Sequence, residues 1–190
     1  MRLLLHICCA PCSVMCIQTL RDEGILPTGF WYNPNIHPVT EYKMRKNTLT
    51  QYAKDIHMPL IVENDYGLRD FVCHVAGDIE HRCGWCYLCR LEETARYAAE
   101  NGFDSFSTTL LISPYQKHEM IVRVGEAMAQ KYGVSFLYRD FRPYFKEGQE
   151  RAKELGLYRQ KYCGCIFSEE DRYLEGKIGK VTFQKYNNRG

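Results

Sequence analysis

The ten cysteines are the residues of this chain whose spacing best supports chemistry. Nine of them fall into three groups that are far apart in the sequence: Cys8, Cys9, Cys12 and Cys16; Cys83, Cys86 and Cys89; Cys163 and Cys165. In a reducing compartment, clustered cysteines are more often metal ligands or catalytic thiols than structural disulfides. The grouping therefore predicts a metal-thiolate or redox-thiol site assembled from distant stretches of the chain.

The compartment must be settled before the cysteines are interpreted. The apolar start of the chain is short, is interrupted at His6 and is followed by Pro11, which does not fit an export signal. No stretch approaches the roughly 20 apolar residues that cross a bilayer. We therefore expect a cytoplasmic protein without a membrane segment. The net charge of +2 excludes neither an acidic nor a basic partner.

The first group combines vicinal thiols with a Cys-x-x-Cys pair. On a turn, Cys8 and Cys9 point in different directions and suit different atoms of a polynuclear centre. Cys9 and Cys12 lead into a predicted helix, whose N-terminal amides favour the thiolate form. Cys16, one helical turn further on, and Cys73, alone on a helix, are predicted to be buried core residues.

The second group contains two overlapping Cys-x-x-Cys pairs. This spacing lets two thiolates approach one metal centre at about 2.3 Å. Two further ligands must come from elsewhere, and the turn at Cys8 and Cys9 is the economical source. A zinc site with four cysteine ligands is the alternative. The surplus of cysteines and the vicinal pair favour an iron-sulfur centre over zinc.

The third group is Cys163-Gly164-Cys165, in which glycine lets the backbone turn tightly between the two thiols. A disulfide across so short a ring is strained and therefore labile, as catalytic disulfides are. The same two sulfurs could instead clasp a metal ion. The spacing leaves both roles open.

The elements that position these cysteines alternate between strands and helices. Strands are predicted at residues 3–7, 28–32, 59–63, 105–113 and 135–141. Helices are predicted from Pro11 toward Arg21, at 40–57, at 66–101 with a break near Gly84, at 117–132 and at 144–155. From Tyr158 onward the chain is predicted to be irregular and to end in a basic tail at about 176–190.

The alternation predicts a three-layer α/β fold with a doubly wound parallel sheet, in one domain that covers residues 1–190. Ligands of such sheets bind outside the carboxyl ends of the strands, and the first strand delivers Cys8 and Cys9 there. Neither a Gly-x-Gly-x-x-Gly fingerprint nor a Gly-Lys-Ser/Thr loop occurs in the sequence. Thiols occupy the position where a nucleotide-binding loop would lie.

Three segments resemble the signature motifs of the epoxyqueuosine reductase QueH family, in the family's order. They are His6-x-Cys8-Cys9-Ala10-Pro11-Cys12, Arg82-Cys83-x-x-Cys86 with Arg90-Leu91, and Tyr162-Cys163-Gly164-Cys165 with Phe167-Ser168. The resemblance implies an oxidoreductase that reduces the epoxide of epoxyqueuosine in tRNA to queuosine, without cobalamin. It also implies a nucleotide-hydrolase-like (HUP-like) sandwich.

The resemblance further implies a [4Fe-4S] cluster with nearby redox thiols or an additional iron ion. By position, the cluster ligands would be Cys8, Cys9, Cys83 and Cys86. Cys163 and Cys165 would form a redox-active pair, or would hold the additional iron together with Cys12. The motifs assign no role to Cys16, Cys73 and Cys89.

The implied partners are the anticodon loop of a tRNA and an electron donor that the sequence does not identify. The basic tail offers cations and aromatic rings for the RNA: Lys177, Lys180, Lys185, Arg189, Phe183 and Tyr186. Tyr115 and His118 are candidate proton donors. Two other functions fit the cysteines, namely an iron-sulfur enzyme that transfers sulfur to tRNA and a zinc-stabilised nucleic-acid-binding module.

Overall fold

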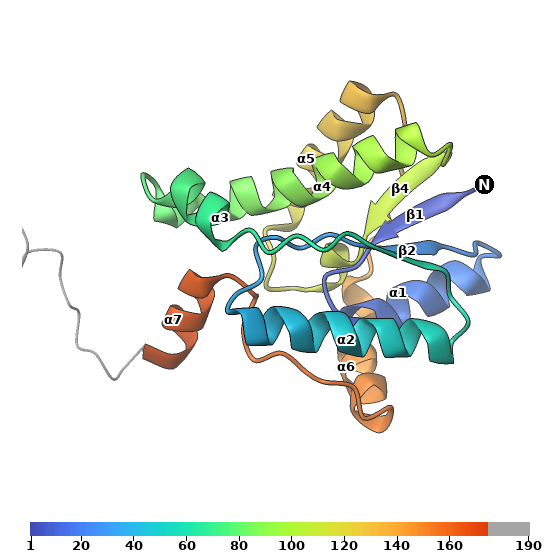
Figure 1. Ribbon diagram of the computed structural model, residues 1–190. Coiled ribbons are helices and arrows are strands. Elements are labelled where there is room, and N and C mark those ends of the chain that lie inside the picture. The colour runs from blue at the N-terminus through green and yellow to red at the C-terminus, as the bar shows by residue number, and fades with distance from the viewer. Residues whose placement is uncertain (175–190) are drawn as a thin grey trace, which may run out of the picture.

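A parallel β-sheet forms the centre of the computed structural model, which describes residues 1–174 (Figure 1). The strand order is β3-β2-β1-β4-β5. The strands are β1 (Leu3–His6), β2 (Thr28–Trp31), β3 (Leu60–Val62), β4 (Ser105–Thr108) and β5 (Ser135–Phe136). Every neighbouring pair of these strands is parallel. β1 is therefore the central strand, which agrees with its run of three leucines.

Helices cover both faces of the sheet. The helices are α1 (Ala10–Asp22), α2 (Val39–Asp55), α3 (Leu68–Val75), α4 (Arg82–Glu100), α5 (His118–Tyr132), α6 (Phe145–Glu154) and α7 (Ile166–Leu174). Short 3-10 turns occupy Ile79–His81, Thr109–Ile112 and Arg142–Tyr144. Figure 1 shows α1, α2 and α6 on one side of the sheet and α4 and α5 on the other.

Successive leucines of β1 supply the two faces of the core. Leu3 and Leu5 pack with buried residues of α1, α2 and α6, whereas Leu4 packs with Ala95 and Ala98 of α4. This alternation follows from the period of two along a strand. The predicted three-layer, doubly wound parallel fold is thereby confirmed.

Three predicted boundaries are wrong. The strand expected at 135–141 ends at Phe136, and residues 137–141 form no strand. The break expected near Gly84 lies earlier, between the end of α3 and the start of α4 at Arg82. Gly84 is tolerated because it lies in the first turn of α4, where the backbone N–H groups have no intrahelical partner. The strand expected at 105–113 ends at Thr108, because the Thr108 hydroxyl accepts a hydrogen bond from the backbone N–H of Leu110 at 3.1 Å and starts a 3-10 turn.

The segment after Tyr158 is also more regular than predicted. It is irregular through Cys163–Gly164–Cys165 and then forms α7. Phe167 of α7 packs against Phe71 of α3, with ring centroids 6.0 Å apart, and Asp171 pairs with Arg82 of α4 at 2.5 Å. These contacts hold α7 beyond the carboxyl ends of the strands. Within residues 1–174, no helix is long and apolar enough to cross a membrane.

Candidate metal-thiol site

The first cysteine group lies on the turn between β1 and α1. Cys9 is the N-cap residue of α1, and Pro11 occupies the first turn of that helix, where its missing N–H costs nothing. The Sγ atoms of Cys8 and Cys9 are 3.8 Å apart, and all three sulfurs of Cys8, Cys9 and Cys12 lie within 4.8 Å of one another. Thiolates bound to one tetrahedral ion at about 2.3 Å lie about 3.8 Å apart. The spacing of this trio therefore suits direct metal ligation.

The three thiols of the trio differ in pKa. Hydrogen bonds from Cys12 and Cys9 hold the pKa of Cys8 well below its usual value, despite burial. The pKa of Cys12 is raised by its hydrogen bonds to Cys8 and Cys9, and that of Cys9 is raised chiefly by burial. The Thr109 hydroxyl also donates to the Cys8 sulfur at 3.5 Å. Cys8 therefore has the lowest pKa of the three thiols.

An amide group completes the surroundings of the trio. The side-chain Nε2 of Gln160 donates to the sulfur of Cys9 at 3.0 Å and to that of Cys12 at 3.6 Å. Gln160 lies on the segment between α6 and α7, so this contact joins the C-terminal part of the described chain to the first turn. No residue-type pattern in the sequence indicates this glutamine.

His6 supports the turn and is not placed as a ligand. Its Nδ1 hydrogen-bonds with the Thr108 hydroxyl at 2.9 Å, and its Nε2 with the backbone oxygen of Tyr32 at 3.2 Å. Complete burial, reinforced by the charge of Arg90, lowers the pKa of His6 to about 4. The ring is therefore neutral at neutral pH, and it ties β1 to its neighbours on both sides.

The second group occupies the first turns of α4. The Cys86 sulfur accepts a hydrogen bond from Nη2 of Arg90 at 2.8 Å, and the backbone oxygen of Cys86 accepts one from Nε of Arg90 at 2.9 Å. Arg90 is only 2% exposed and forms no ion pair with a carboxylate among residues 1–174. Isolated buried charge is unfavourable, so the donor set favours an anionic sulfur centre beside Arg90.

The third group lies just before α7. The Cys163 sulfur accepts a hydrogen bond from Nε2 of Gln116 at 3.2 Å, and the Cys165 sulfur accepts one from the backbone N–H of Ser168 at 3.4 Å. Between them, Gly164 has φ +149°, and a Cβ atom there would lie 3.2 Å from Nη1 of Arg45. Both cysteines are unbridged thiols. A residue with a side chain at position 164 would therefore disturb the turn.

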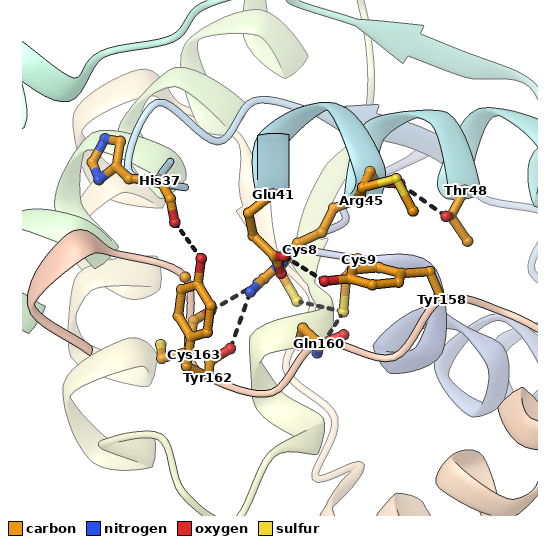
Figure 2. A network of polar contacts seen from close by, with 12 residues as sticks. Cys8, Cys9, His37, Glu41, Arg45, Thr48, Tyr158, Gln160, Tyr162 and Cys163 are labelled. Atoms are coloured by element: carbon orange, nitrogen blue, oxygen red, sulfur yellow. Dashed lines mark hydrogen bonds and ion pairs between the residues drawn. The ribbon is translucent and has the colours of Figure 1, made fainter. Parts of the chain in front are cut away.

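A buried arginine of α2 holds this third group in place (Figure 2). Arg45 donates to the backbone oxygens of Cys163 and Tyr162 at 2.8 and 3.0 Å, and its Nε donates to Glu41 at 2.7 Å. The second carboxylate oxygen of Glu41 accepts a hydrogen bond from the Tyr158 hydroxyl. We call Arg45, Glu41 and Tyr158 the α2 anchor. In the sequence, the only feature that indicates this anchor is the i,i+4 spacing of Glu41 and Arg45. Because such pairs are common on exposed helices, the spacing does not predict a buried ion pair.

Two cavities bring the three groups together. The larger, of about 650 Å³, is lined by Cys8, Cys12, Arg90, Gln160 and Cys163, among other residues. The smaller, of about 130 Å³, is lined by Cys83, Cys86, Cys163 and Cys165 on its sulfur-bearing side.

Cys163, Gln116 and Tyr115 line both cavities and so form the ridge between them. Cysteines of all three groups therefore line two cavities that share Cys163.

Individual predictions have different outcomes. Cys16 is buried, as predicted, but Cys73 is exposed, because α3 turns Phe71 and Val75 toward the core and Cys73 away from it. The division of ligands between one cluster and a second metal stays a prediction. Within residues 1–174, Cys8, Cys9 and Cys12 are the group whose sulfurs lie close enough to bind one metal ion. Thiolates that bind different irons of one cluster lie farther apart than the ligands of a single ion.

The two candidate proton donors separate. Tyr115 lies at the mouth of both cavities, whereas His118 lines neither and instead hydrogen-bonds with the Tyr138 hydroxyl at 3.2 Å. The predicted RNA contacts of Lys177, Lys180, Lys185 and Arg189, with Phe183 and Tyr186, lie outside the described residues.

Comparison with known proteins gives consistent matches. The family model described as "Epoxyqueuosine reductase QueH" matches residues 3–171. A protein of that name from Dehalococcoides mccartyi is 39% identical over 172 residues, which is 90% of this chain and 94% of the relative. One from Thermotoga maritima is 39% identical over 180 residues, covering 89% and 91%.

Among solved structures, a predicted subunit of tRNA methyltransferase from Methanocaldococcus jannaschii is similar with a TM-score of 0.47 and 16% identity, over 80% of this chain and 88% of that one.

Proposed function

Because the chain belongs to the epoxyqueuosine reductase QueH family, we propose that it reduces the epoxide of epoxyqueuosine in tRNA to the alkene of queuosine, without cobalamin. The observation that carries the proposal is the convergence of cysteines from three segments on cavities that share Cys163. A tRNA substrate implies that the reaction occurs in the cytoplasm.

The thiols fit an iron-sulfur centre. We propose Cys8, Cys9, Cys83 and Cys86 as ligands of a [4Fe-4S] cluster, which would supply electrons one at a time. The lowered pKa of Cys8 and the buried guanidinium of Arg90 beside Cys86 support an anionic centre between the two segments. This assignment leaves Cys12 free to bind a second iron. In the alternative with a second iron, Cys163 and Cys165 would be its other ligands.

The reaction consumes two electrons and two protons per epoxide. In the thiol alternative, Cys163 and Cys165 lose two electrons and two protons as they form a disulfide, the two carbon–oxygen bonds of the epoxide break, and the oxygen leaves as water. An external reductant then regenerates the thiols. Gln116, hydrogen-bonded to the Cys163 sulfur, would orient that thiol, and Tyr115, which lines the same cavity, would be the candidate proton donor. The larger cavity is within the usual volume for a small-molecule site.

The decisive experiment is anaerobic turnover of epoxyqueuosine-containing tRNA with a strong reductant, followed by mass analysis of the nucleosides. Queuosine should appear only with the protein present. Cys163→Ser and Cys165→Ser should each lower turnover by at least about 100-fold, or about 2.7 kcal/mol of transition-state stabilisation. The exposed Cys73→Ser is the matched control and should retain full activity.

Metal content separates the remaining alternatives. Elemental analysis of anaerobically purified protein should give iron and acid-labile sulfide. Stoichiometric zinc without sulfide would instead indicate a zinc-stabilised binding module, for which the spacing of Cys8, Cys9 and Cys12 is equally suitable. Full turnover in both Cys163→Ser and Cys165→Ser with unchanged iron would remove this pair from the mechanism.

A further inference from the structure

Three cations without an ion-pair partner among residues 1–174 line the larger cavity. Arg159 and Lys161, on the segment between α6 and α7, and Arg172 of α7 all line it and are all exposed. Within the described part of the chain, none of the three forms an ion pair. The other two arginines of the cavity, Arg45 and Arg90, are buried and hydrogen-bonded to the protein. The outer three are therefore available to an anionic ligand.

An exposed aromatic ring stands at the same mouth. Tyr115 is 86% exposed, more than any other large hydrophobic side chain of the described residues. Phe145 supports it edge-on, with ring centroids 5.7 Å apart and the ring planes at 82°. An exposed ring that is braced by a second aromatic residue is a platform on which a nucleobase stacks.

The three cations, the exposed ring of Tyr115 and the thiol-lined cavity together indicate the class of ligand. A membrane headgroup or an acidic peptide would use the cations but neither the aromatic platform nor the thiol-lined cavity behind it. Single-stranded RNA uses all of them, because one base leaves the stack and enters a pocket while neighbouring bases and phosphates stay outside. Because the thiols line the cavity, a base must leave the stack before its substituent can reach a sulfur atom.

We propose that Arg159, Lys161 and Arg172 bind the RNA phosphates that flank the modified nucleotide, and that Tyr115 stacks on a neighbouring base. This inference rests on the proposed function for its choice of RNA. It assigns the RNA contacts to the cavity mouth and does not require the basic tail.

The test is the salt dependence of binding to an anticodon stem-loop RNA, measured by fluorescence anisotropy with the full-length, metal-loaded protein. Each phosphate contact to single-stranded nucleic acid contributes about 0.7 to the slope of log Kd against log salt concentration. The triple variant Arg159→Gln, Lys161→Gln, Arg172→Gln should therefore reduce that slope by about 2.

The control is the triple variant Lys54→Gln, Arg69→Gln, Arg123→Gln, which changes the net charge equally. These residues are exposed, line none of the described cavities and form no ion pair within residues 1–174. Its slope should stay within experimental error of the parent value. Equal loss of slope in both triple variants, or no loss in the cavity-mouth variant, would overturn the proposal.

Stacking has a separate signature. Tyr115→Ala should weaken binding about 5- to 150-fold at every salt concentration, with the slope unchanged, while Tyr115→Phe should bind like the parent. Equal affinity of the alanine variant and the parent would remove the stacking part. Binding is measured without turnover, so a protein that binds through these residues but produces no queuosine would refute the proposed reaction and leave the interface standing. If the protein produces queuosine but the cavity-mouth triple variant keeps the parent salt slope, the proposed reaction stands and the proposed interface is refuted.

Discussion

Arg90 shows how one side chain reports the charge of the sulfur centre. Its guanidinium is buried, and its nearest described acceptors are the sulfur and the backbone oxygen of Cys86. If the sulfur centre were neutral, an apolar replacement would relieve an uncompensated buried charge. If the centre is anionic, the replacement leaves its buried negative charge without a compensating cation.

We therefore predict that Arg90→Met destabilises the metal-loaded protein by about 3 to 5 kcal/mol. At about 2 to 4 °C per kcal/mol for a chain of this size, the melting temperature should fall by about 6 to 20 °C. Circular dichroism measured anaerobically provides the readout.

Arg96→Met serves as the control for Arg90→Met, because Arg96 lies on the same helix but is only half-buried in its pairs with Glu93 and Glu100. It should cost less than about 1 kcal/mol. A loaded Arg90→Met protein that melts at or above the parent temperature would contradict an anionic centre.

At the residue scale, the sequence predicted the reactive atoms but not their partners. Cysteine has distinctive chemistry wherever it occurs, so the three groups were visible from spacing alone. Gln116, Gln160 and Arg45 belong to common polar types, and only the folded chain brings them to sulfur or to the Cys163 backbone. Cys73 was misplaced because a lone cysteine on a short helix gives no indication of which face is buried.

At the scale of elements, α2 determines where the Cys163 and Cys165 turn lies. The α2 anchor holds two backbone oxygens of that turn, and the backbone N–H of His37 donates to Gly164 at 2.8 Å. The Arg45 side chain is 1% exposed and that of Glu41 8%. Loss of one partner leaves the other charged and buried, which typically costs about 3 to 5 kcal/mol.

Arg45→Gln should therefore lower the free energy of unfolding by about 3 to 5 kcal/mol. The double variant Arg45→Gln, Glu41→Gln should be less destabilised than the two single variants together, because neither charge is then unpaired. Urea unfolding of the four proteins gives the coupling energy.

Hydrogen exchange provides a second readout for the α2 anchor. In Arg45→Gln, amides at 158–165 should lose protection while those of β1 and β4 retain it. Strict additivity of the two substitutions, with unchanged protection at 158–165, would show that the anchor does not hold the turn.

Element types were easier to predict than their ends. The long apolar and amphipathic segments identified the strands and α1, α2, α4 and α5. The end of β4 was missed because the Thr108 hydroxyl, which starts the next turn, looks like any other strand threonine. α7 was missed because its stability derives from Phe71 and Arg82, residues that are about 90 positions away in sequence.

At the scale of the whole molecule, metal loading should act as a ligand of the folded state alone. Its proposed ligands come from residues that only the native fold assembles, so the unfolded chain binds more weakly. At about 100 times the dissociation constant, such a ligand adds about 2.7 kcal/mol of stability, or about 5 to 11 °C in melting temperature.

Anaerobic reconstitution with iron and sulfide should produce that rise, and a chelator should reverse it. Cys73→Ser should retain both the metal content and the rise, whereas Cys8→Ser should lose most of each. An unchanged melting temperature after chelation, with iron shown to be removed, would mean that the site forms without help from the metal.

The contacts between residues 37–45 and residues 158–163 join parts of the chain that are far apart in sequence, which has a consequence for the growing polypeptide. Arg45 contacts Cys163 across 118 positions, and Tyr162 donates to His37 across 125. While a ribosome is still translating the second half, Cys8, Cys9 and Cys12 have neither Gln160 nor Cys163 beside them. The three thiols of the first turn therefore complete their folded surroundings only after residues 160–163 have been synthesised.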